Sequence, residues 1–340
     1  MISRQVLVEE QSQVAEGRRV AAGMASDGGF NETEVGQVSI VATELATNLL
    51  KHARGGELLL ISWGERQRRL EIVALDKGPG MADVRQCLED GYSTAGSTGS
   101  GLGAVLRLAT RLEVYTAPQK GTTAFAEFHP APNGTWARAA AGGLSIPIRG
   151  EQVCGDAWDA RQDGDTVELL VADGLGHGPG AAEASGAAVE IFRRHPGLAP
   201  KDMVETIHQG LQKTRGAAIG AARIDLAGGE LRFAGVGNTS GVIVGRDGRQ
   251  HSVLSHNGTA GMAVVMRTVQ EYAYPFPEGA VAIFHSDGLA THWNLSAYPG
   301  LGNCHPTLLA AVLYRDFKRG RDDVTVVSVG RRSANADAGG

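Results

Sequence analysis

The sequence has no long apolar run, no paired cysteine motif and no dense stretch of basic residues. Because no apolar run could cross a bilayer and no apolar signal core follows Met1, we expect neither a membrane span nor a secretory signal. The three cysteines, Cys87, Cys154 and Cys304, are far apart and show no CxxC spacing, which indicates reduced thiols and a cytoplasmic protein. A net charge of −5 with no Lys/Arg run argues against binding to nucleic acid.

The composition is otherwise that of a globular protein, with 42% hydrophobic and 20% charged residues. A chain of 340 residues is long for one hydrophobic core. The segment HPAPNGTWARAAAGG, residues 129–143, contains two prolines, an Asn-Gly and a Gly-Gly, which is typical of a linker. We therefore predict two domains, at 1–130 and 143–332, joined by a linker at 131–142 and followed by a flexible tail at 333–340. No internal repeat is evident, so the two domains are different modules.

Both halves mix helical and strand-like patterns, so the predicted fold class is α+β in two domains. In the first half, apolar residues recur at helical spacing over 9–25, 32–53 and 102–110, with strand-like runs between and after them. The second half is rich in strand-like runs. Helical patterns occur there at 180–194, 201–214 and 306–317.

A P-loop is missing: no GxxxxGK[ST] occurs, which excludes a Walker-type nucleotide site. The segment VATELATNLLKHA nevertheless places Glu44 and Asn48 four residues apart, on one stripe of a helix whose other face is apolar. Asn offers a neutral oxygen to Mg²⁺, and Glu can accept a proton from an attacking hydroxyl group. Taken alone, the same pair is also typical of a solvated helix face.

Glycine-rich segments follow in the first half. Asp76, in DKGPGM, ends a strand-like run, where its carboxylate could accept a hydrogen bond from an exocyclic amine such as that of adenine, and Gly78 and Gly80 would leave room for the ring. A second segment supplies glycines directly before a helix, where exposed N–H groups cradle phosphates. These glycines are Gly96, Gly99, Gly101 and Gly103.

These three motifs, in this order, resemble the N, G1 and G2 boxes of the GHKL ATPase and kinase superfamily. The segment from Asp76 to Val114 resembles the anti-sigma-factor serine kinases of the RsbT type. The resemblance implies an α/β sandwich that binds ATP, with Asn48 on Mg²⁺, Asp76 on adenine and Glu44 as the base that deprotonates a substrate serine. It also implies that Thr122, in KGTTAF, lies near the adenine pocket. No phospho-acceptor histidine domain is recognisable, which argues against a sensor histidine kinase.

Four aspartates in the second half each border an apolar strand-like run. They are Asp156 in VCGDAWD, Asp173 in VADGLGHG, Asp287 in HSDGLA and Asp322 in GRDDVTVVSV. One such aspartate would be typical of a turn, but four in one strand-rich module favour convergence at one end of a sandwich. An oxygen-only site selects Mg²⁺ or Mn²⁺ over zinc. Two such ions about 3.5–4 Å apart can activate a water molecule and neutralise a phosphoryl group.

The order of these motifs resembles the metal-dependent Ser/Thr phosphatases of the PPM type, and especially their bacterial SpoIIE/RsbX branch. The resemblance implies a β-sandwich flanked by helices. It assigns Asp173 to both metals, with help from the Gly174 carbonyl through water. Asp287 would complete one metal and Asp322 the other, with Asp156 supporting them.

Four further points concern the two resemblances. Asp323 is an adjacent alternative to Asp322 as a metal ligand. His177 is expected to pack its turn beside the metals, and His52 in the first half to be only a helix neighbour of the nucleotide. No counterpart of a phosphate-gripping arginine is recognisable, so phosphate binding is expected to rely on the metals alone.

Together these patterns predict a bifunctional switch enzyme that phosphorylates and dephosphorylates Ser/Thr, with ATP, Mg²⁺ and Mn²⁺ as cofactors. The resemblance points to a STAS-domain anti-sigma-factor antagonist or a stressosome-like protein as the partner. The main alternative is a phosphatase regulated by a first domain that only binds ATP or a partner. A small-molecule phosphatase would leave the first half unexplained. Whether the chain forms a homo-oligomer is left open.

Overall fold

The computed structural model describes residues 1–63, 68–81, 83–84, 101–129, 139–262 and 269–331. The chain divides into two compact units, 1–134 and 135–340, and each is described by itself. Among the described residues, no helix is both long enough and apolar enough to cross a membrane.

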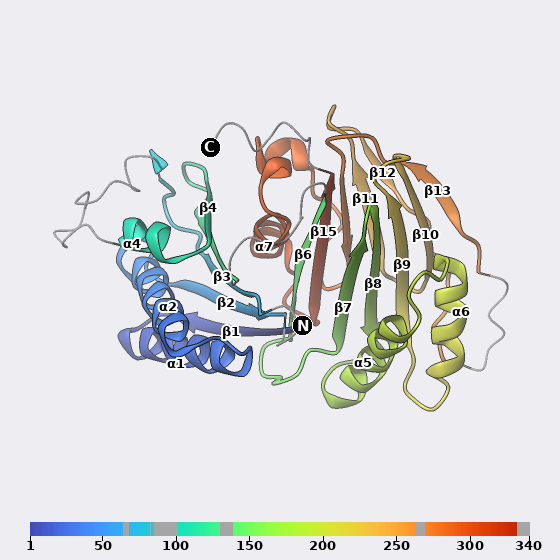
Figure 1. The fold of residues 1–340 in the computed structure, drawn as a ribbon, viewed down its shortest axis with the longest axis horizontal. Coiled ribbons are helices and arrows are strands. Elements are labelled where there is room, and N and C mark those ends of the chain that lie inside the picture. The colour runs from blue at the N-terminus through green and yellow to red at the C-terminus, as the bar shows by residue number, and fades with distance from the viewer. Residues whose placement is uncertain (64–67, 82, 85–100, 130–138, 263–268, 332–340) are drawn as a thin grey trace. The chain divides into compact units, whose positions relative to one another are not determined.

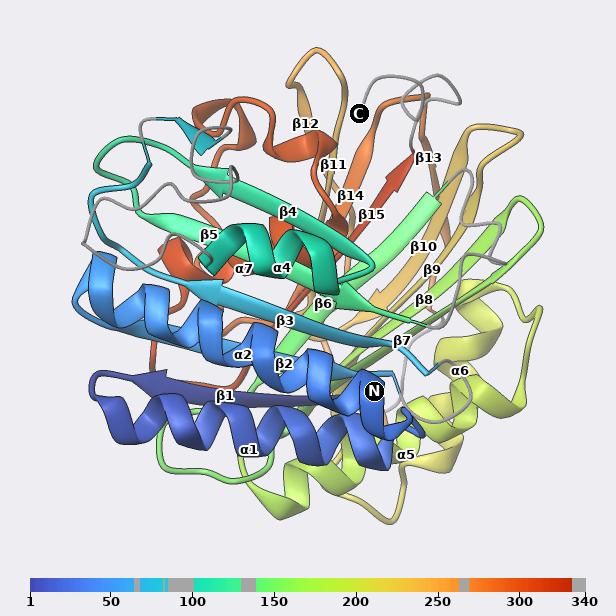
Figure 2. The ribbon, with the colours of Figure 1, turned by 60° about the vertical axis from the view of Figure 1, so that its left-hand side comes forward.

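The first unit is a five-stranded antiparallel sheet with helices over one face. Its strand order is β1-β2-β3-β5-β4, and α1, α2 and α4 lie across the sheet (Figure 2). The bounds are β1 Ile2–Val8, α1 Gln11–Asp27, α2 Glu32–Ala53, β2 Gly56–Ser62, β3 Leu70–Leu75, α4 Gly101–Leu108, β4 Arg111–Thr116 and β5 Thr122–Phe128.

Helix α2 is the element that positions the first candidate site. Asn31 and Glu34 form a capping box at its start, each side chain accepting a hydrogen bond from the other residue's backbone N–H. Its apolar stripe, which includes Leu45 and Leu49, is buried in one core cluster with residues of β2 and β3. This packing fixes the opposite stripe, with Glu44 and Asn48, outside the core.

The second unit is a sandwich of two antiparallel five-stranded sheets. One sheet has the order β13-β10-β9-β8-β7 and the other β12-β11-β14-β15-β6. Helices α5 and α6 cover the outer face of the first sheet, and α7 packs on β6 and β15 of the second (Figure 1). The strand bounds are β6 Ala139–Ile146, β7 Asp156–Asp163, β8 Thr166–Gly174, β9 Ala217–Asp225, β10 Glu230–Val236, β11 Ser240–Val244, β12 Gln250–Ser252, β13 Tyr272–Pro275, β14 Val281–His285 and β15 Val324–Arg331. The helix bounds are α5 Pro179–Arg194, α6 Pro200–Gly210 and α7 Pro306–Phe317, with single 3₁₀ turns at Leu295–Ala297 and Leu301–Asn303.

The segment Ala139–Gly142, placed in the linker by its composition, is the start of strand β6, which pairs with β15. The glycines there are required by close packing. A Cβ on Gly142 would lie 2.4 Å from Thr307 Oγ1, and one on Gly143 would lie 2.4 Å from the Val326 carbonyl oxygen. A stretch that looks like a linker because its residues are alanine and glycine is therefore a strand on which a helix packs closely.

The predicted fold class, α+β in two domains, is confirmed. Strand β1 was not expected from the sequence, and neither were the short strands β11, β12 and β13. Helix α6 ends at Gly210, four residues earlier than predicted.

Candidate functional sites

The first candidate site lies where α2 meets the start of α4. A Cβ on Gly101 would lie 3.5 Å from Asn48 Oδ1 and 3.5 Å from Glu44 Oε2. Glu44 and Asn48, predicted as proton acceptor and Mg²⁺ ligand, therefore lie beside the first residue of the glycine-led helix, which is predicted to bind phosphate. The N–H groups at this helix start carry partial positive charge, which favours an anion there.

Asp76 follows the last residue of β3 and is held by the start of β5. Its Oδ1 accepts hydrogen bonds from the N–H groups of Gly78 at 2.8 Å and Thr122 at 3.1 Å. The Asp76 N–H in turn donates to the Thr122 carbonyl at 2.9 Å. The Thr122 hydroxyl lies 3.1 Å from that of Thr116. Asp76 and Thr122 are therefore neighbours, and the carboxylate has a fixed orientation.

Gly78 and Gly80 are needed for contacts within the protein itself. A Cβ on Gly78 would lie 2.9 Å from Ala53 Cβ at the end of α2, and one on Gly80 would lie 2.3 Å from the Ala117 carbonyl oxygen. Gly80 also has a φ of 75°, which favours glycine. Their role in making room for an adenine ring stays a prediction.

The remaining residues of this prediction are placed as follows. Gly103 is buried within α4. Gly96 and Gly99 lie outside the described residues. His52 is exposed in the last turn of α2.

The second candidate site lies at one end of the sandwich. Asp173 is the penultimate residue of β8 and pairs with Asp156, the first residue of β7. Asp287 follows β14 and Asp322 precedes β15, in the other sheet. Asp173, Asp287 and Asp322 line one cavity of about 400 Å³. Four aspartates that are far apart in sequence therefore converge where the two sheets end.

The electrostatics of this cavity indicate a cation. Burial raises the pKa of Asp173 to about 7, with a further contribution from Asp287 and Asp322. Burial, followed by the nearby Asp173, also raises the pKa of Asp156 well above its usual range. Oδ2 of Asp156 is buried without a hydrogen-bond partner among the described residues. Buried carboxylates in such proximity are costly unless a positive charge offsets them.

Comparison with known proteins separates the two units. The family model described as stage II sporulation protein E, SpoIIE, matches residues 163–332, which is half of the chain. A model of the histidine kinase-like ATPase domain matches residues 7–126. The serine/threonine-protein kinase RsbT of Bacillus subtilis (strain 168) is 30% identical over 118 residues, covering 34% of this chain and 89% of RsbT. The chain belongs to the SpoIIE family and carries an RsbT-like kinase domain.

Further relatives agree with this division. The phosphoserine phosphatase RsbX of Bacillus subtilis (strain 168) is 26% identical over 140 residues, covering 41% of this chain and 69% of RsbX. A solved chain described with the words "The bacterial stressosome: a modular system that has been adapted to control secondary messenger signaling" is 26% identical, with a TM-score of 0.52, over 56% of this chain and 99% of that one. A crystal structure of RsbX in complex with magnesium shares the fold, at 18% identity and a TM-score of 0.51, over 65% of this chain and 100% of that one.

Within the SpoIIE domain, Asp322 and its neighbour Asp323 have different surroundings. Asp323 is 2% exposed, and its two carboxylate oxygens accept the N–H groups of Ile148 at 2.7 Å and Gly155 at 2.6 Å. It therefore fixes the connection between β6 and β7. Asp322 lines the cavity instead, and burial raises its pKa. Of the two alternatives left open by the sequence, this geometry favours Asp322 as a metal ligand.

The SpoIIE cavity also contains residues that the sequence did not single out. Asn238, just after β10, donates a hydrogen bond from Nδ2 to Asp287 Oδ2 at 2.6 Å. Asn257 lines the same cavity. The available signal for Asn238 was its place after a strand end, as for the aspartates. His177 is not among the lining residues, and its Nδ1 lies 2.8 Å from Glu151 Oε1 across the glycine-rich turn.

The donor set of the SpoIIE cavity fits hard divalent cations. Its charged groups are carboxylates, and its neutral polar side chains are the amides of Asn238 and Asn257 and the hydroxyl of Thr259. Neither histidine nor cysteine is among the lining residues, so the donor chemistry favours Mg²⁺ or Mn²⁺ over zinc. The unpartnered Oδ2 of Asp156 is the buried polar atom that a cation would satisfy.

Proposed function

We propose that this chain is a bifunctional signalling switch. Its RsbT-like domain transfers a phosphoryl group from Mg-ATP to serine or threonine of a partner protein, and its SpoIIE domain removes that group by hydrolysis. The observation that carries the proposal is the convergence of Asp173, Asp287 and Asp322 on one cavity, next to the buried Asp156. The similarity of the two halves to RsbT and RsbX supports the pairing of opposite activities in one chain.

In the SpoIIE domain, Asp173, Asp287 and Asp322 would hold two divalent ions, with Asp156 and the Gly174 carbonyl supporting them. When bound, such ions lower the pKa of water and neutralise the phosphoryl oxygens. The protein's own contribution is rigidity. Asp173 is fixed by the β7–β8–β9 pairing, and Asn238 orients Asp287 through the bond from Nδ2.

In the RsbT-like domain, Glu44 would accept the proton of the substrate hydroxyl as it attacks the terminal phosphoryl group. Asn48 would offer its amide oxygen to Mg²⁺. The N–H groups at the start of α4 would bind the phosphates, since Gly101 lies against both side chains. Asp76 and Thr122 would bind adenine at the far end of the nucleotide.

The proposed partner is a STAS-domain anti-sigma-factor antagonist or a stressosome-type regulator. RsbT is named as a protein kinase and RsbX as a phosphoserine phosphatase. The lining of the SpoIIE cavity supports a protein substrate, because it includes the apolar Leu175, which is 49% exposed. Apolar side chains at a rim suit the residues that flank a phosphorylated side chain.

The decisive experiment incubates the purified full chain with candidate STAS-domain proteins, Mg-ATP and Mn²⁺, and follows phosphorylation by mass spectrometry. Asp173→Ala should accumulate phosphoserine or phosphothreonine on the partner, because the product is no longer hydrolysed. The double variant with Glu44→Gln should not, because loss of general-base help costs about 10²–10⁴ in rate. Glu32→Gln, an exposed change in the first turn of the same helix, is the matched control.

A different outcome would select the alternative function. If no variant phosphorylates any partner, and ATP nevertheless changes the rate of dephosphorylation, the first domain regulates the phosphatase without being a kinase. If the SpoIIE domain releases no phosphate from any phosphoprotein, the bifunctional proposal fails as a whole.

A further inference from the structure

A guanidinium group lies on the glycine-rich turn that follows Asp173. Arg215 precedes β9, and a Cβ placed on Gly180 would lie 2.6 Å from its Nε and 2.8 Å from its Cζ. A Cβ on Gly176 would lie 3.5 Å from Arg215 Nη1. The missing side chain at Gly180 leaves room for the guanidinium, and Gly176 lies in ordinary contact distance of it.

This position is at the edge of the SpoIIE cavity. Gly176 lines the cavity together with Asp173. The backbone beside Arg215 is fixed to the same turn, because the Leu175 N–H donates to the Gly216 carbonyl at 3.0 Å. Strand β9 then continues the pairing, with Ala218 opposite Asp173. The arginine backbone and the proposed metal ligand thus belong to one hydrogen-bonded framework.

Among the described residues, no carboxylate offsets the charge of Arg215. The side chain is exposed, and within the described part of the chain no acidic group lies within ion-pair distance of it. The cavity beside it is lined by three aspartates. A cation at the rim of an acidic cavity, without an ion-pair partner of its own, is available to an incoming anion.

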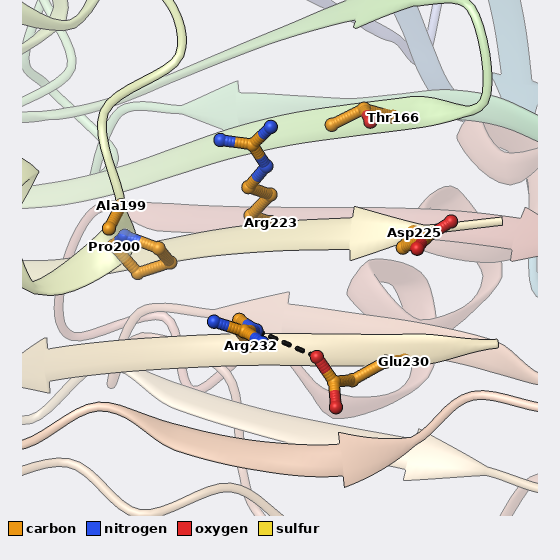
Figure 3. Close-up of a pocket in the computed structure, with 7 residues that line it drawn as sticks. All are labelled: Thr166, Ala199, Pro200, Arg223, Asp225, Glu230 and Arg232. Atoms are coloured by element: carbon orange, nitrogen blue, oxygen red, sulfur yellow. Dashed lines mark hydrogen bonds and ion pairs between the residues drawn. The ribbon is translucent and has the colours of Figure 1, made fainter. Parts of the chain in front are cut away.

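A second cavity in the same sheet provides the contrast. It has a volume of about 300 Å³ and lies at the opposite end of β8, β9 and β10, where Thr166, Asp225 and Glu230 line it (Figure 3). Its arginines already have acidic neighbours. Arg232 Nε lies 2.7 Å from Glu230 Oε1, and Arg223 Nη1 lies 3.9 Å from Glu168 Oε1. These cations have acidic neighbours, whereas Arg215 has none in the part of the chain that the structure describes.

We propose that Arg215 binds the phosphoryl group of the phosphoserine or phosphothreonine substrate. Its planar fork of N–H donors matches phosphate oxygens and would form charge-assisted hydrogen bonds to them. The proposal rests on the phosphatase function proposed above, and it replaces the expectation that metals alone bind the phosphate. Arg215 is a substrate-binding residue in this assignment, and it takes no part in proton transfer.

The test compares Arg215→Ala with the wild-type full chain in two assays. In steady-state hydrolysis of a phosphoserine peptide with Mn²⁺, the variant should raise KM about tenfold or more, since a hydrogen bond to a charged group contributes about 1.5–3 kcal/mol. The value of kcat should stay within about twofold. In calorimetry with Mg²⁺, the variant should weaken the binding of inorganic phosphate by a similar factor.

Two further variants test whether the effect depends on the guanidinium group and on its position. Arg215→Lys keeps the charge but loses the fork, so it should fall between wild type and Arg215→Ala in both assays. Arg232→Ala removes an exposed arginine from the second cavity and should change neither KM nor phosphate affinity. Unchanged KM and phosphate affinity in Arg215→Ala would overturn the assignment, and so would an equal loss in Arg232→Ala.

Failure of the proposed function can be told apart from failure of this inference. Binding of inorganic phosphate requires no turnover. If the wild-type protein hydrolyses no phosphopeptide, the phosphatase function fails, and the calorimetry still decides whether Arg215 binds phosphate. If the wild-type protein is active and Arg215→Ala behaves like it, only the role of Arg215 fails.

Discussion

Asp156 lies directly opposite Asp173 on the neighbouring strand, and Oδ2 of Asp156 is buried without a hydrogen-bond partner among the described residues. Both carboxyl groups have raised pKa values, first because they are buried and then because acidic groups surround them. This fold places two acids side by side at a strand end, with Asp287 and Asp322 nearby. When these carboxyl groups are ionised, they repel one another. A divalent cation would relieve this repulsion, and the first three predictions follow from this relationship.

The first prediction concerns the loss of Asp173. Asp173→Ala should abolish phosphate release in the presence of Mn²⁺, as should a chelator on the wild-type protein. The fold should survive, because Asp173 is half-buried at a strand end and its removal relieves the repulsion from Asp287 and Asp322. Phosphate release and circular dichroism measure the two effects. Asp163→Ala, at the exposed opposite end of β7, is the control and should stay active. Full activity in chelator would contradict the metal assignment.

The second prediction concerns the metal-free protein and pH. An unfolded aspartate has a pKa of about 3.9, whereas that of folded Asp173 is raised to about 7. Between these values the folded state binds more protons than the unfolded state, so the free energy of unfolding falls as the pH rises. One such group contributes at most about 1.4 kcal/mol per pH unit. Thermal melts in chelator should therefore show lower stability at pH 7.5 than at pH 5.

Proton binding to the same carboxylates also determines how much a bound metal stabilises the protein. Mn²⁺ should raise the melting temperature more at pH 7.5 than at pH 5, because at the lower pH protons compete for the carboxylates. Asp173→Asn should flatten both dependences. A pH-independent metal effect in the wild-type protein would argue against the acidic cluster as the binding site.

A third prediction separates two neighbouring aspartates. Asp323→Ala should lower the stability of the metal-free protein, because the N–H groups of the half-buried Ile148 and the buried Gly155 lose their acceptor. A buried N–H group without a partner costs about 1–3 kcal/mol. Asp322→Ala removes a repelling charge together with the acceptor of the Asp323 N–H, at 2.9 Å. It should therefore lower the metal-free stability less than Asp323→Ala does, and it should weaken Mn²⁺ binding. Denaturation curves and metal titration distinguish them. The reverse pattern would make Asp323 the ligand.

Much of this arrangement could be predicted from the sequence, because strand ends and helix starts carry local signals. The spacing of Glu44 and Asn48 predicted a shared helix face, and both side chains lie against Gly101. The aspartates bordering apolar runs predicted convergence, and three of them line one cavity. The contacts of Asp323 with Ile148 and Gly155, and the place of Arg215 on the glycine-rich turn, depend on how distant segments pack. No periodicity in the sequence encodes them.

The amino-acid composition gave a wrong prediction for a segment whose structure depends on backbone packing. Ala139–Gly142 has no side chain larger than a methyl group and so resembles a linker, but it forms the start of β6. Strand β1 precedes the first helical pattern and was not expected. Apolar and polar residues do not alternate regularly along its sequence, and its apolar residues Ile2 and Leu7 are exposed. Its place at the sheet edge comes from pairing with β2.

The last prediction concerns Asp76 and ATP. Oδ1 of Asp76 accepts the N–H groups of Gly78 and Thr122, and an asparagine could keep its oxygen in that position. Its NH₂ group would then stand where the second carboxylate oxygen was, presenting a donor to the adenine amine, which is itself a donor. Mispairing one buried polar contact costs about 1–3 kcal/mol, so Asp76→Asn should bind ATP about tenfold or more weakly.

Calorimetry on the full chain measures this loss of ATP affinity, with the exposed Asp27→Asn at the end of α1 as the matched control. Because the bonds to Gly78 and Thr122 survive, the melting temperature without nucleotide should change little. Equal ATP affinity in Asp76→Asn and wild type would remove Asp76 from the adenine pocket.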